Sequence, residues 1–296
     1  MSRVHDALRR AEQLAVKQAD PVPSTGSLVL PRGAVPPGGD EPATVAARGG
    51  SVSLPRISLS ILDQVEEVPF NPAAESHLIN LDHPQVTPSE EFRALRTKLN
   101  HLQTLQPIHN ILVTSPAPAE GKSFTAANLA LAQAHLAENL TLLADLDLRR
   151  PVMHQLFQIN QAPGFSDYLL GNASLGQVLK RVAGTNLYLM PAGSPVKNPL
   201  ELLNLRDVKT LFEQLPQIFN WAIFDTPPIL FSADANLLST LADGTVLVVR
   251  IGATTIDSVT RAMQALCNNN VLGVVANGAR AGELYYKYTY YYNRQD

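Results

Sequence analysis

Cysteine is nearly absent from this sequence, since Cys267 is the only one among 296 residues. An internal disulfide framework and a zinc cluster built on cysteines are therefore excluded. No apolar run reaches the ~18 residues of a membrane-spanning helix, and residues 1–6 lack the apolar core of a signal peptide. The 23 Lys and Arg residues are outnumbered by 26 Asp and Glu residues, so net charge gives no support for nucleic-acid binding. We therefore expect a cytoplasmic protein whose contact with a membrane comes through a partner.

The strongest motif is the phosphate loop, residues 115–123, which read Ser-Pro-Ala-Pro-Ala-Glu-Gly-Lys-Ser. An apolar run over 111–114 predicts a buried strand before it, and a segment rich in Ala and Leu over 124–138 predicts a helix after it. Phosphate binding requires this context, because the N–H groups of the loop and the helix then point at the phosphates. Pro116 and Ala119 stand where glycine is common. The alternative is an ordinary strand-to-helix connection with a capping serine.

Individual residues of the phosphate loop have predicted roles. Lys122 is expected to reach the β- and γ-phosphates of a nucleotide, and the Ser123 hydroxyl is expected to hold Mg²⁺. The candidate nucleotide-binding residues in and after the loop are Ala117, Pro118, Ala119, Glu120, Gly121, Lys122, Ser123 and Phe124.

Composition divides the chain into four regions. Residues 1–18 predict an N-terminal amphipathic helix, which is either a docking element or a frayed helix in solvent. Residues 19–76 are a linker rich in Pro, Gly, Ala and Ser, in which 52–62 could form a short edge strand. Residues 77–282 hold the main domain, and residues 283–296 form a tail dense in tyrosine.

Strand and helix signals alternate along the main domain. Apolar runs predict strands at 77–81, 110–115, 141–146, 186–191, 221–225, 244–250 and 271–276. Helical spacing predicts helices at 89–99, 122–138, 200–215, 233–241 and 256–269, with short helical pieces over 152–184. Apolar strands bounded by helices pair in parallel with both faces covered. The predicted fold is therefore α/β: a doubly wound, mostly parallel sheet with helices on both faces, of the P-loop NTPase type.

Acidic residues end two of the predicted strands. Asp145 and Asp147 lie two apart, on one side of an extended chain, and Asp225 ends a second apolar run. Ligands of open parallel sheets sit at the carboxyl ends of the strands. One carboxylate could bind the metal, another could accept a proton from the attacking hydroxyl, and Arg149 with Arg150 could neutralise the transferring phosphoryl group. The alternative for each Asp is a turn residue that caps the next segment.

Two further segments carry functional hypotheses. Glu90, Arg93 and Arg96 stand three apart on one face of the predicted helix over 89–99, as either a solvated face or an interface for another subunit. The tail holds six of the eight tyrosines. A flexible terminus dense in phenolic hydroxyls offers several phosphate acceptors, whereas the alternative is a sticky edge strand. The candidate acceptors are Tyr285, Tyr286, Tyr288, Tyr290, Tyr291 and Tyr292.

Taken together, these motifs resemble the bacterial tyrosine kinases of exopolysaccharide and capsule assembly, over roughly residues 77–296. The Asp-x-Asp-x-Arg element of that family is met by Asp145, Asp147 and Arg149, and its Asp-x-x-Pro element by Asp225 and Pro228. Its Glu-x-x-Arg-x-x-Arg helix, used for ring-like self-association, is met by Glu90, Arg93 and Arg96. Residues 1–8 are similar to the start of stand-alone members.

The resemblance implies a relative of the ParA/MinD ATPases that uses ATP and Mg²⁺ to phosphorylate its own tyrosines. Lys122 would then hold phosphate, while Ser123 and Asp225, with Asp145 as a further candidate ligand, would hold Mg²⁺. Asp145 would be the base on the tyrosine hydroxyl, Asp147 would support the metal site, and Asn277 would contact adenine. The implied partners are other copies of the chain, a separate membrane protein that controls polysaccharide chain length, and a cognate tyrosine phosphatase.

Two other functions are compatible with parts of the sequence. A positioning ATPase of the ParA/MinD class would carry a second Lys early in the phosphate loop, where Ala117 stands here, and would lack the tyrosine tail. A non-catalytic scaffold for polysaccharide assembly would have no need of Lys122 or of the three Asp residues.

Overall fold

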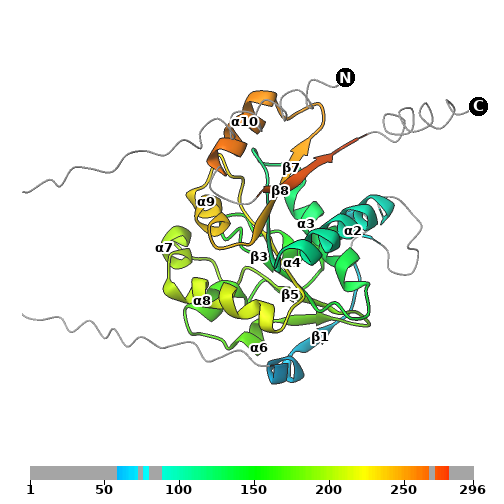
Figure 1. Cartoon of the computed structure of the whole chain (residues 1–296). Helices are drawn as coiled ribbons and strands as arrows, with labels where there is room; N and C mark the ends of the chain where they lie inside the picture. Colours follow the sequence, from blue (N-terminus) through cyan, green and yellow to red (C-terminus); the bar gives the residue numbers. More distant parts are fainter. Residues whose placement is uncertain (1–58, 73–75, 80–88, 267–270, 280–296) are drawn as a thin grey trace, which may run out of the picture. The chain divides into compact units, whose positions relative to one another are not determined.

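The computed structural model describes residues 59–72, 76–79, 89–266 and 271–279, all within the unit Leu54–Asp296 (Figure 1). The predicted helix over 1–18, Cys267 and the tail tyrosines lie outside these residues, so those predictions remain predictions. No helix among the described residues has both the length and the apolar character needed to cross a bilayer.

A single eight-stranded sheet forms the centre of this unit, in the order β1-β4-β5-β3-β6-β2-β7-β8. Its neighbouring strands pair in parallel, except β4 with β5. The strands are β1 Glu66–Val68, β2 Asn110–Thr114, β3 Thr141–Asp145, β4 Lys180–Val182, β5 Leu187–Met190, β6 Trp221–Asp225, β7 Gly244–Arg250 and β8 Val271–Asn277. The predicted mostly parallel sheet is confirmed.

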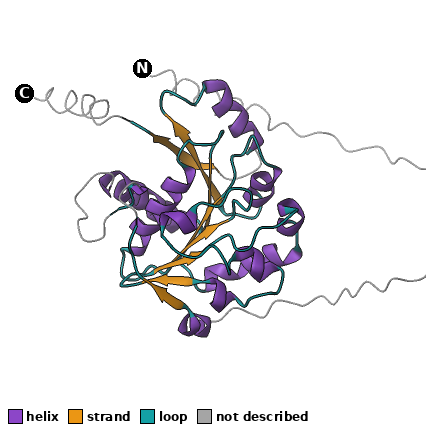
Figure 2. Ribbon diagram, turned by 180° about the vertical axis from the view of Figure 1, so that it is seen from behind, coloured by secondary structure: helices purple, strands orange, loops and turns teal. Residues whose placement is uncertain are grey.

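Helices cover both faces of the sheet (Figures 1 and 2). The longer ones are α2 Ser89–Leu105, α3 Lys122–Ala134, α8 Arg206–Gln214, α9 Ala233–Ser239 and α10 Ile256–Ala265. Shorter helices are α4 Met153–Leu156, α5 Phe165–Leu169, α6 Leu175–Val178 and α7 Pro199–Leu203, with 3₁₀ turns η1 Leu59–Gln64 and η3 Leu215–Gln217. The predicted doubly wound arrangement is therefore confirmed.

Strand β6 shows how the two faces are built. Trp221 and Ile223 pack in the core cluster that includes residues of α2 and α3. Ala222 and Phe224 pack in the opposite cluster, which includes residues of α5, α6, α7 and α8. Successive side chains of a strand point to opposite faces, so a strand covered on both sides must be apolar throughout. The continuous apolar run that predicted this strand is the consequence.

Several sequence predictions differ from the structure, including the stretch 152–184 of predicted helical pieces, which also contains strand β4. The described part of the predicted strand at 77–81 is not a strand, and His77 has a φ of 51°, outside the β region. Residues 59–62 begin the 3₁₀ turn η1, and the edge strand is β1 instead, inside the stretch 19–76 assigned to a linker. The predicted helix over 200–215 is two helices, because Leu205 takes an extended backbone. The predicted helix over 122–138 ends at Ala134.

Candidate active site

The phosphate loop connects β2 to α3 at the carboxyl edge of the sheet, as predicted. Gly121 caps α3 with a φ of 95°, a conformation that side chains rarely adopt. A Cβ atom at this position would lie 1.9 Å from Nδ2 of Asn277, so a side chain here would have to displace that amide. Ala119 also has a positive φ, 62°, which explains why glycine is common at that position in such loops. The tight turn aims the first N–H groups of α3 out of the sheet edge.

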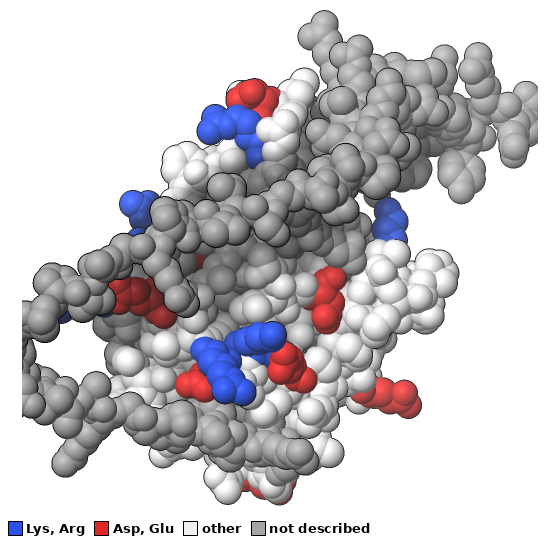
Figure 3. Space-filling view, turned by 60° about the vertical axis from the view of Figure 1, so that its left-hand side comes forward, with Lys and Arg blue, Asp and Glu red and all other residues white. Residues whose placement is uncertain are grey.

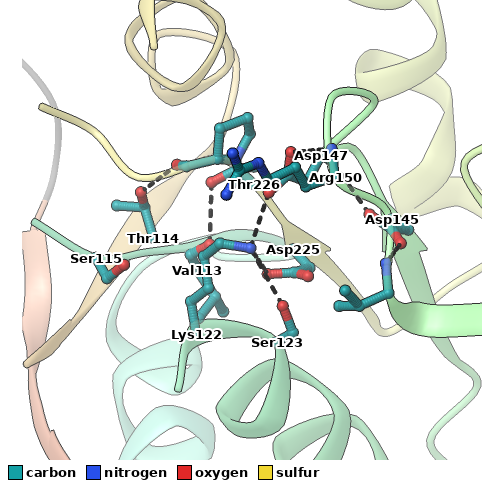
Figure 4. A network of polar contacts seen from close by, with 12 residues as sticks. Val113, Thr114, Ser115, Lys122, Ser123, Asp145, Asp147, Arg150, Asp225 and Thr226 are labelled. Atoms are coloured by element: carbon teal, nitrogen blue, oxygen red, sulfur yellow. Dashed lines mark hydrogen bonds and ion pairs between the residues drawn. The ribbon is translucent and has the colours of Figure 1, made fainter. Parts of the chain in front are cut away.

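Lys122 lies between the acidic ends of two strands (Figure 4). Its Nζ is 3.0 Å from Oδ2 of Asp147 and 3.5 Å from Oδ1 of Asp225, and it donates to the Ser123 hydroxyl at 3.2 Å. Burial lowers the pKa of Lys122, but the charges of Asp225 and Asp147 outweigh that effect and leave the pKa raised. The structure therefore brings three of the predicted residues around the ammonium group of a fourth, Lys122.

Asp145 is fully buried beside these residues, and its carboxylate is fixed by backbone groups. Oδ1 accepts the N–H of Asp147 at 3.1 Å, and Oδ2 accepts those of Val152 and Met153 at 3.0 Å each. Burial and the neighbouring charge of Asp225 raise the pKa of Asp145 to about 7. Asp145 therefore also caps the following segment, because its Oδ2 atom satisfies the N–H groups of Val152 and Met153 at the start of α4.

The residues around Asp225 fit a magnesium ion. Its Oδ2 atom is buried and has no hydrogen-bond partner among the described residues. Burial raises the pKa of Asp225, and the charge of Lys122 only partly offsets that effect. In the described part of the chain, no group of three or more His, Cys, Asp or Glu side chains could hold a metal by itself. Mg²⁺ commonly takes only one or two carboxylates and completes its shell with phosphate and water, so the donor set of Asp225 and Ser123 suffices.

Arg149 forms an ion pair that the sequence analysis missed. Its Nε and Nη2 atoms donate to the two carboxylate oxygens of Asp234 at 2.6 and 3.1 Å. The Arg149 side chain is half exposed, whereas that of Asp234 is buried in the first turn of α9. The only sequence signal was an acid that follows Ser232 at a helix start. Arg150 also lies at the site, where its backbone N–H donates to Oδ1 of Asp147 at 3.1 Å.

The predicted interface residues on α2 do not all share one environment. Arg93 pairs with Glu90 at 2.5 Å on the exposed side of the helix. Arg96 instead donates to the carbonyl of Ala132 at 2.9 Å, in the last turn of α3. The face predicted for self-association therefore also holds α2 against the helix that begins at the phosphate loop.

On the face shown in Figure 3, the Lys and Arg side chains are scattered among acidic and uncharged ones and form no continuous basic patch.

The site has a phosphate loop at the end of one parallel strand and acidic residues at the ends of the two nearest strands on one side. This arrangement defines the P-loop nucleotide-binding proteins of the α/β class.

No family model matches the chain. Among curated proteins, it is 34% identical over 219 residues to tyrosine-protein kinase YwqD of Bacillus subtilis, spanning 73% of this chain and 92% of that protein. It is 31% identical over 198 residues to the putative tyrosine-protein kinase CapB of Staphylococcus aureus, spanning 66% of this chain and 86% of that protein.

Solved structures give the same result. The kinase domain of the Escherichia coli tyrosine kinase Etk matches with a TM-score of 0.62 and 30% identity, over 74% of this chain and 93% of that domain. The chimerical protein CapA2B2 matches with a TM-score of 0.65 and 28% identity, over 75% of this chain and 97% of that chain. The chain belongs to the bacterial tyrosine-protein kinases, and the predicted enzyme class is confirmed. It spans only 27% of full-length Etk of E. coli K12.

Proposed function

We propose that this tyrosine-protein kinase transfers the γ-phosphoryl group of ATP to tyrosines of its own C-terminal cluster. The observation that carries the proposal is the position of Lys122, which joins the phosphate loop to Asp147, just after β3, and to Asp225 at the end of β6. A cation there faces both the phosphates of a nucleotide and the carboxylates that serve a hydroxyl acceptor. A loop that only bound nucleotide would have no need of a buried proton acceptor beside it.

The nucleotide would be held by the backbone N–H groups at the start of α3 and by the Lys122 ammonium group. Ser123 and Asp225 would hold Mg²⁺, with Asp145 as a further candidate ligand, and the bound ion would neutralise phosphate charge. Lys122 would then exchange its contacts with Asp147 and Asp225 for phosphate oxygens.

Asp145 is the proposed base. A general base works best when its pKa lies near the working pH, and the pKa of about 7 meets that condition. As the tyrosine oxygen forms its bond to the γ-phosphorus, its proton passes to Asp145, the bond from phosphorus to the bridging oxygen breaks, and ADP leaves. Three backbone N–H groups hold the carboxylate in place during this step. Arg149, fixed by Asp234, would neutralise the phosphoryl group.

A cavity of about 300 Å³ lined by Arg149 is the proposed entrance for the tyrosine. It lies between the segment after β3 and the segment after β5, and its volume is at the lower end of the range for ligand sites. Its walls combine apolar side chains with the polar groups of Arg149 and His154. The lining residues are Leu148, Arg149, Pro151, His154, Gln155, Gln161, Ala192, Gly193, Ser194 and Pro195.

The wider setting follows from the family resemblance. Phosphorylation between subunits would take place in a ring-like homo-oligomer whose contacts include Glu90, Arg93 and Arg96. A separate membrane protein would recruit the cytoplasmic kinase and activate it, a tyrosine phosphatase would reverse the reaction, and the cycle would regulate exopolysaccharide or capsule polymerisation and export.

One experiment tests the proposal directly. The full-length protein is incubated with ATP labelled at the γ-phosphate, with Mg²⁺ or with EDTA, and probed for phosphotyrosine and for released phosphate. We expect magnesium-dependent label on the C-terminal peptide. ATP hydrolysis without phosphotyrosine would favour a positioning ATPase, and label confined to other residues would contradict the tail as the acceptor.

A further inference from the structure

The side of the phosphate loop that faces away from Asp145 and Asp225 is fixed by a buried carboxylate. Glu120 is only 4% exposed. Its Oε2 atom accepts the N–H of Ala117 at 2.8 Å, and its Oε1 atom accepts the hydroxyl hydrogen of Thr254. Both oxygens are thus used within the chain. A negative side chain inside a loop that must receive negative phosphates is electrostatically unfavourable, so its hydrogen bonds are the reason to look for a role.

Thr254 connects this carboxylate to the end of strand β7. Its Oγ1 atom accepts the N–H of Arg250 at 2.7 Å while it donates to Glu120. Arg250 also reaches the loop directly, with Nη1 donating to the carbonyl of Ala119 at 3.4 Å. A continuous series of hydrogen bonds therefore runs from the last residue of β7 through Thr254 and Glu120 to Ala117.

Asn277, the last residue of β8, completes the arrangement. Its Nδ2 atom donates to the carbonyl of Glu120 at 3.0 Å, and its Oδ1 atom accepts the N–H of Gly278 at 2.8 Å. The same amide lies where a side chain at Gly121 would have to go. Asn277 therefore contacts the loop backbone on both sides of the Glu120–Gly121 bond, whatever further contact it makes with adenine.

We infer that Glu120 and Thr254 are positioning residues that set the nucleotide affinity of the kinase by fixing the phosphate loop to β7 and β8. The Ala117 N–H is consumed by Glu120, so the phosphates are left to the N–H groups nearer α3 and to Lys122. Loss of the Thr254 hydroxyl would release the outer half of the loop, and each binding event would then have to order it again. The chemical step would be little affected, because Lys122 and the acids of β3 and β6 hold the inner side.

The inference rests on the proposed binding of ATP and is tested with Thr254→Val, which removes the hydroxyl at nearly constant volume. Thr254→Ser restores the hydroxyl. Thr260→Val is the matched control, because the Thr260 hydroxyl, on the helix α10 that begins two residues after Thr254, donates to the carbonyl of Ile256 within that helix. The measurements on the full-length protein are binding of Mg-ADP by calorimetry, KM for ATP and kcat for autophosphorylation, and thermal melting without nucleotide.

We expect Thr254→Val to raise both the Kd for Mg-ADP and the KM for ATP about tenfold, as the loss of one hydrogen bond to a charged group would. Its kcat at saturating ATP should match that of Thr260→Val, its melting temperature should lie only a few degrees lower, and Thr254→Ser should bind like the wild type. Glu120→Gln keeps an oxygen that can accept the N–H of Ala117. This variant should bind Mg-ADP at least as tightly as Thr254→Ser does.

Unchanged Kd and KM in Thr254→Val would overturn the inference, as would a failure of Thr254→Ser to restore binding. If Thr254→Val does not fold, the folded variants Glu120→Ala and Glu120→Gln are compared instead. Weaker binding of Mg-ADP by Glu120→Ala than by Glu120→Gln supports the inference, and equal binding refutes it. Absence of Mg-ADP binding by the wild type would instead refute the proposed nucleotide site, so the two failures are distinguishable.

Discussion

Asp145 and Asp225 stand directly opposite each other in the register of the parallel strands β3 and β6. Burial raises the pKa of both carboxyl groups, and the charge of Asp225 raises the pKa of Asp145 further. The Lys122 ammonium group offsets part of the repulsion. The pair therefore holds a proton at about neutral pH, next to the proposed position of the tyrosine hydroxyl.

The pair predicts how stability without nucleotide depends on pH. An unfolded Asp titrates near 3.8, whereas folded Asp145 titrates at about 7. A raised pKa means that the folded state holds the proton more tightly, so this stabilisation is complete below about pH 4 and is lost as the pH rises through about 7. In EDTA, the melting temperature of the wild type should fall more between about pH 5 and about pH 8 than that of Asp145→Asn, which cannot ionise. Parallel curves would contradict the raised pKa.

Lys122→Met should abolish autophosphorylation. Removal of one charge that stabilises the transition state typically costs about 10²- to 10³-fold in kcat. We expect the variant to fold, because Asp145 and Asp225 already favour protonation and can become neutral when the ammonium group is lost. Phosphotyrosine and thermal melting are measured together, with Lys209→Met as the control, since the Lys209 side chain is exposed on α8. Near-normal labelling of folded Lys122→Met would refute the role of Lys122.

The ion pair of Arg149 with Asp234 should couple in a double-mutant cycle. Arg149→Ala leaves a buried carboxylate without its partner, so we expect it to destabilise the fold more than Arg149→Ala does in an Asp234→Ala background. Because the Arg149 side chain is half exposed, solvent screening limits the coupling to about 1 kcal/mol. Urea unfolding of the four proteins measures it. Additive single-variant effects would show that the pair does not hold Arg149 in place.

Arg93→Ala and Arg96→Ala should separate assembly from stability. Both should lower self-association and labelling between subunits, because charge contacts set the register of an interface. Only Arg96→Ala should also lower the melting temperature, by about 2–4 °C, since it loses a hydrogen bond to α3 worth about 1 kcal/mol. Light scattering and melting are compared with Lys98→Ala, an exposed residue of the same helix. An assembly size unchanged in the double variant would mean that the face is solvated.

Phosphate on the tail should weaken the assembly that makes it. Each phosphotyrosine adds about −1.5 to −2 charges at pH 7, and these repel a site that contains Asp145, Asp147 and Asp225. A variant with Phe at Tyr285, Tyr286, Tyr288, Tyr290, Tyr291 and Tyr292 keeps the aromatic rings and lacks the acceptors. In Mg-ATP with the activating segment of its partner, this variant should stay associated while the wild type dissociates. Equal dissociation of the two would exclude the tail phosphates as the release signal.

Local patterns predicted the parts of the molecule that local physics determines. Strand β6 could be predicted because a doubly covered strand must be apolar at every position, and Asp225 could be assigned to the site because ligands of parallel sheets gather at the carboxyl edge. The short strand β1 was missed because Glu66 and Glu67 break the apolar pattern. Its place in the sheet depends on pairing with β4, including an ion pair of Glu66 with Lys180 at 2.5 Å.

Contacts between distant segments could not be predicted from spacing. Asp234 lies 85 residues after Arg149, and Thr254 lies 134 residues after Glu120. The local sequence around either residue of a pair does not indicate the other residue. The two residues are neighbours because of the order of strands in the sheet and not because of their order in the chain. The same holds for Arg96, whose contact with α3 divides a face that helical spacing alone presents as uniform.

The order of the strands places the proposed base and the last described strand at different positions along the sheet. The chain leaves the described sheet at the edge strand β8, whereas the proposed base ends β3, and β6, β2 and β7 lie between them. With the tail as the proposed acceptor following β8 and the proposed base at the end of β3, one molecule would have two unlike ends. Copies joined by such unlike ends would repeat one contact until the series closes. In a closed ring every subunit would both phosphorylate a neighbour and be phosphorylated by one. The extent of phosphorylation would therefore report whether the ring had closed, and not how many subunits were present.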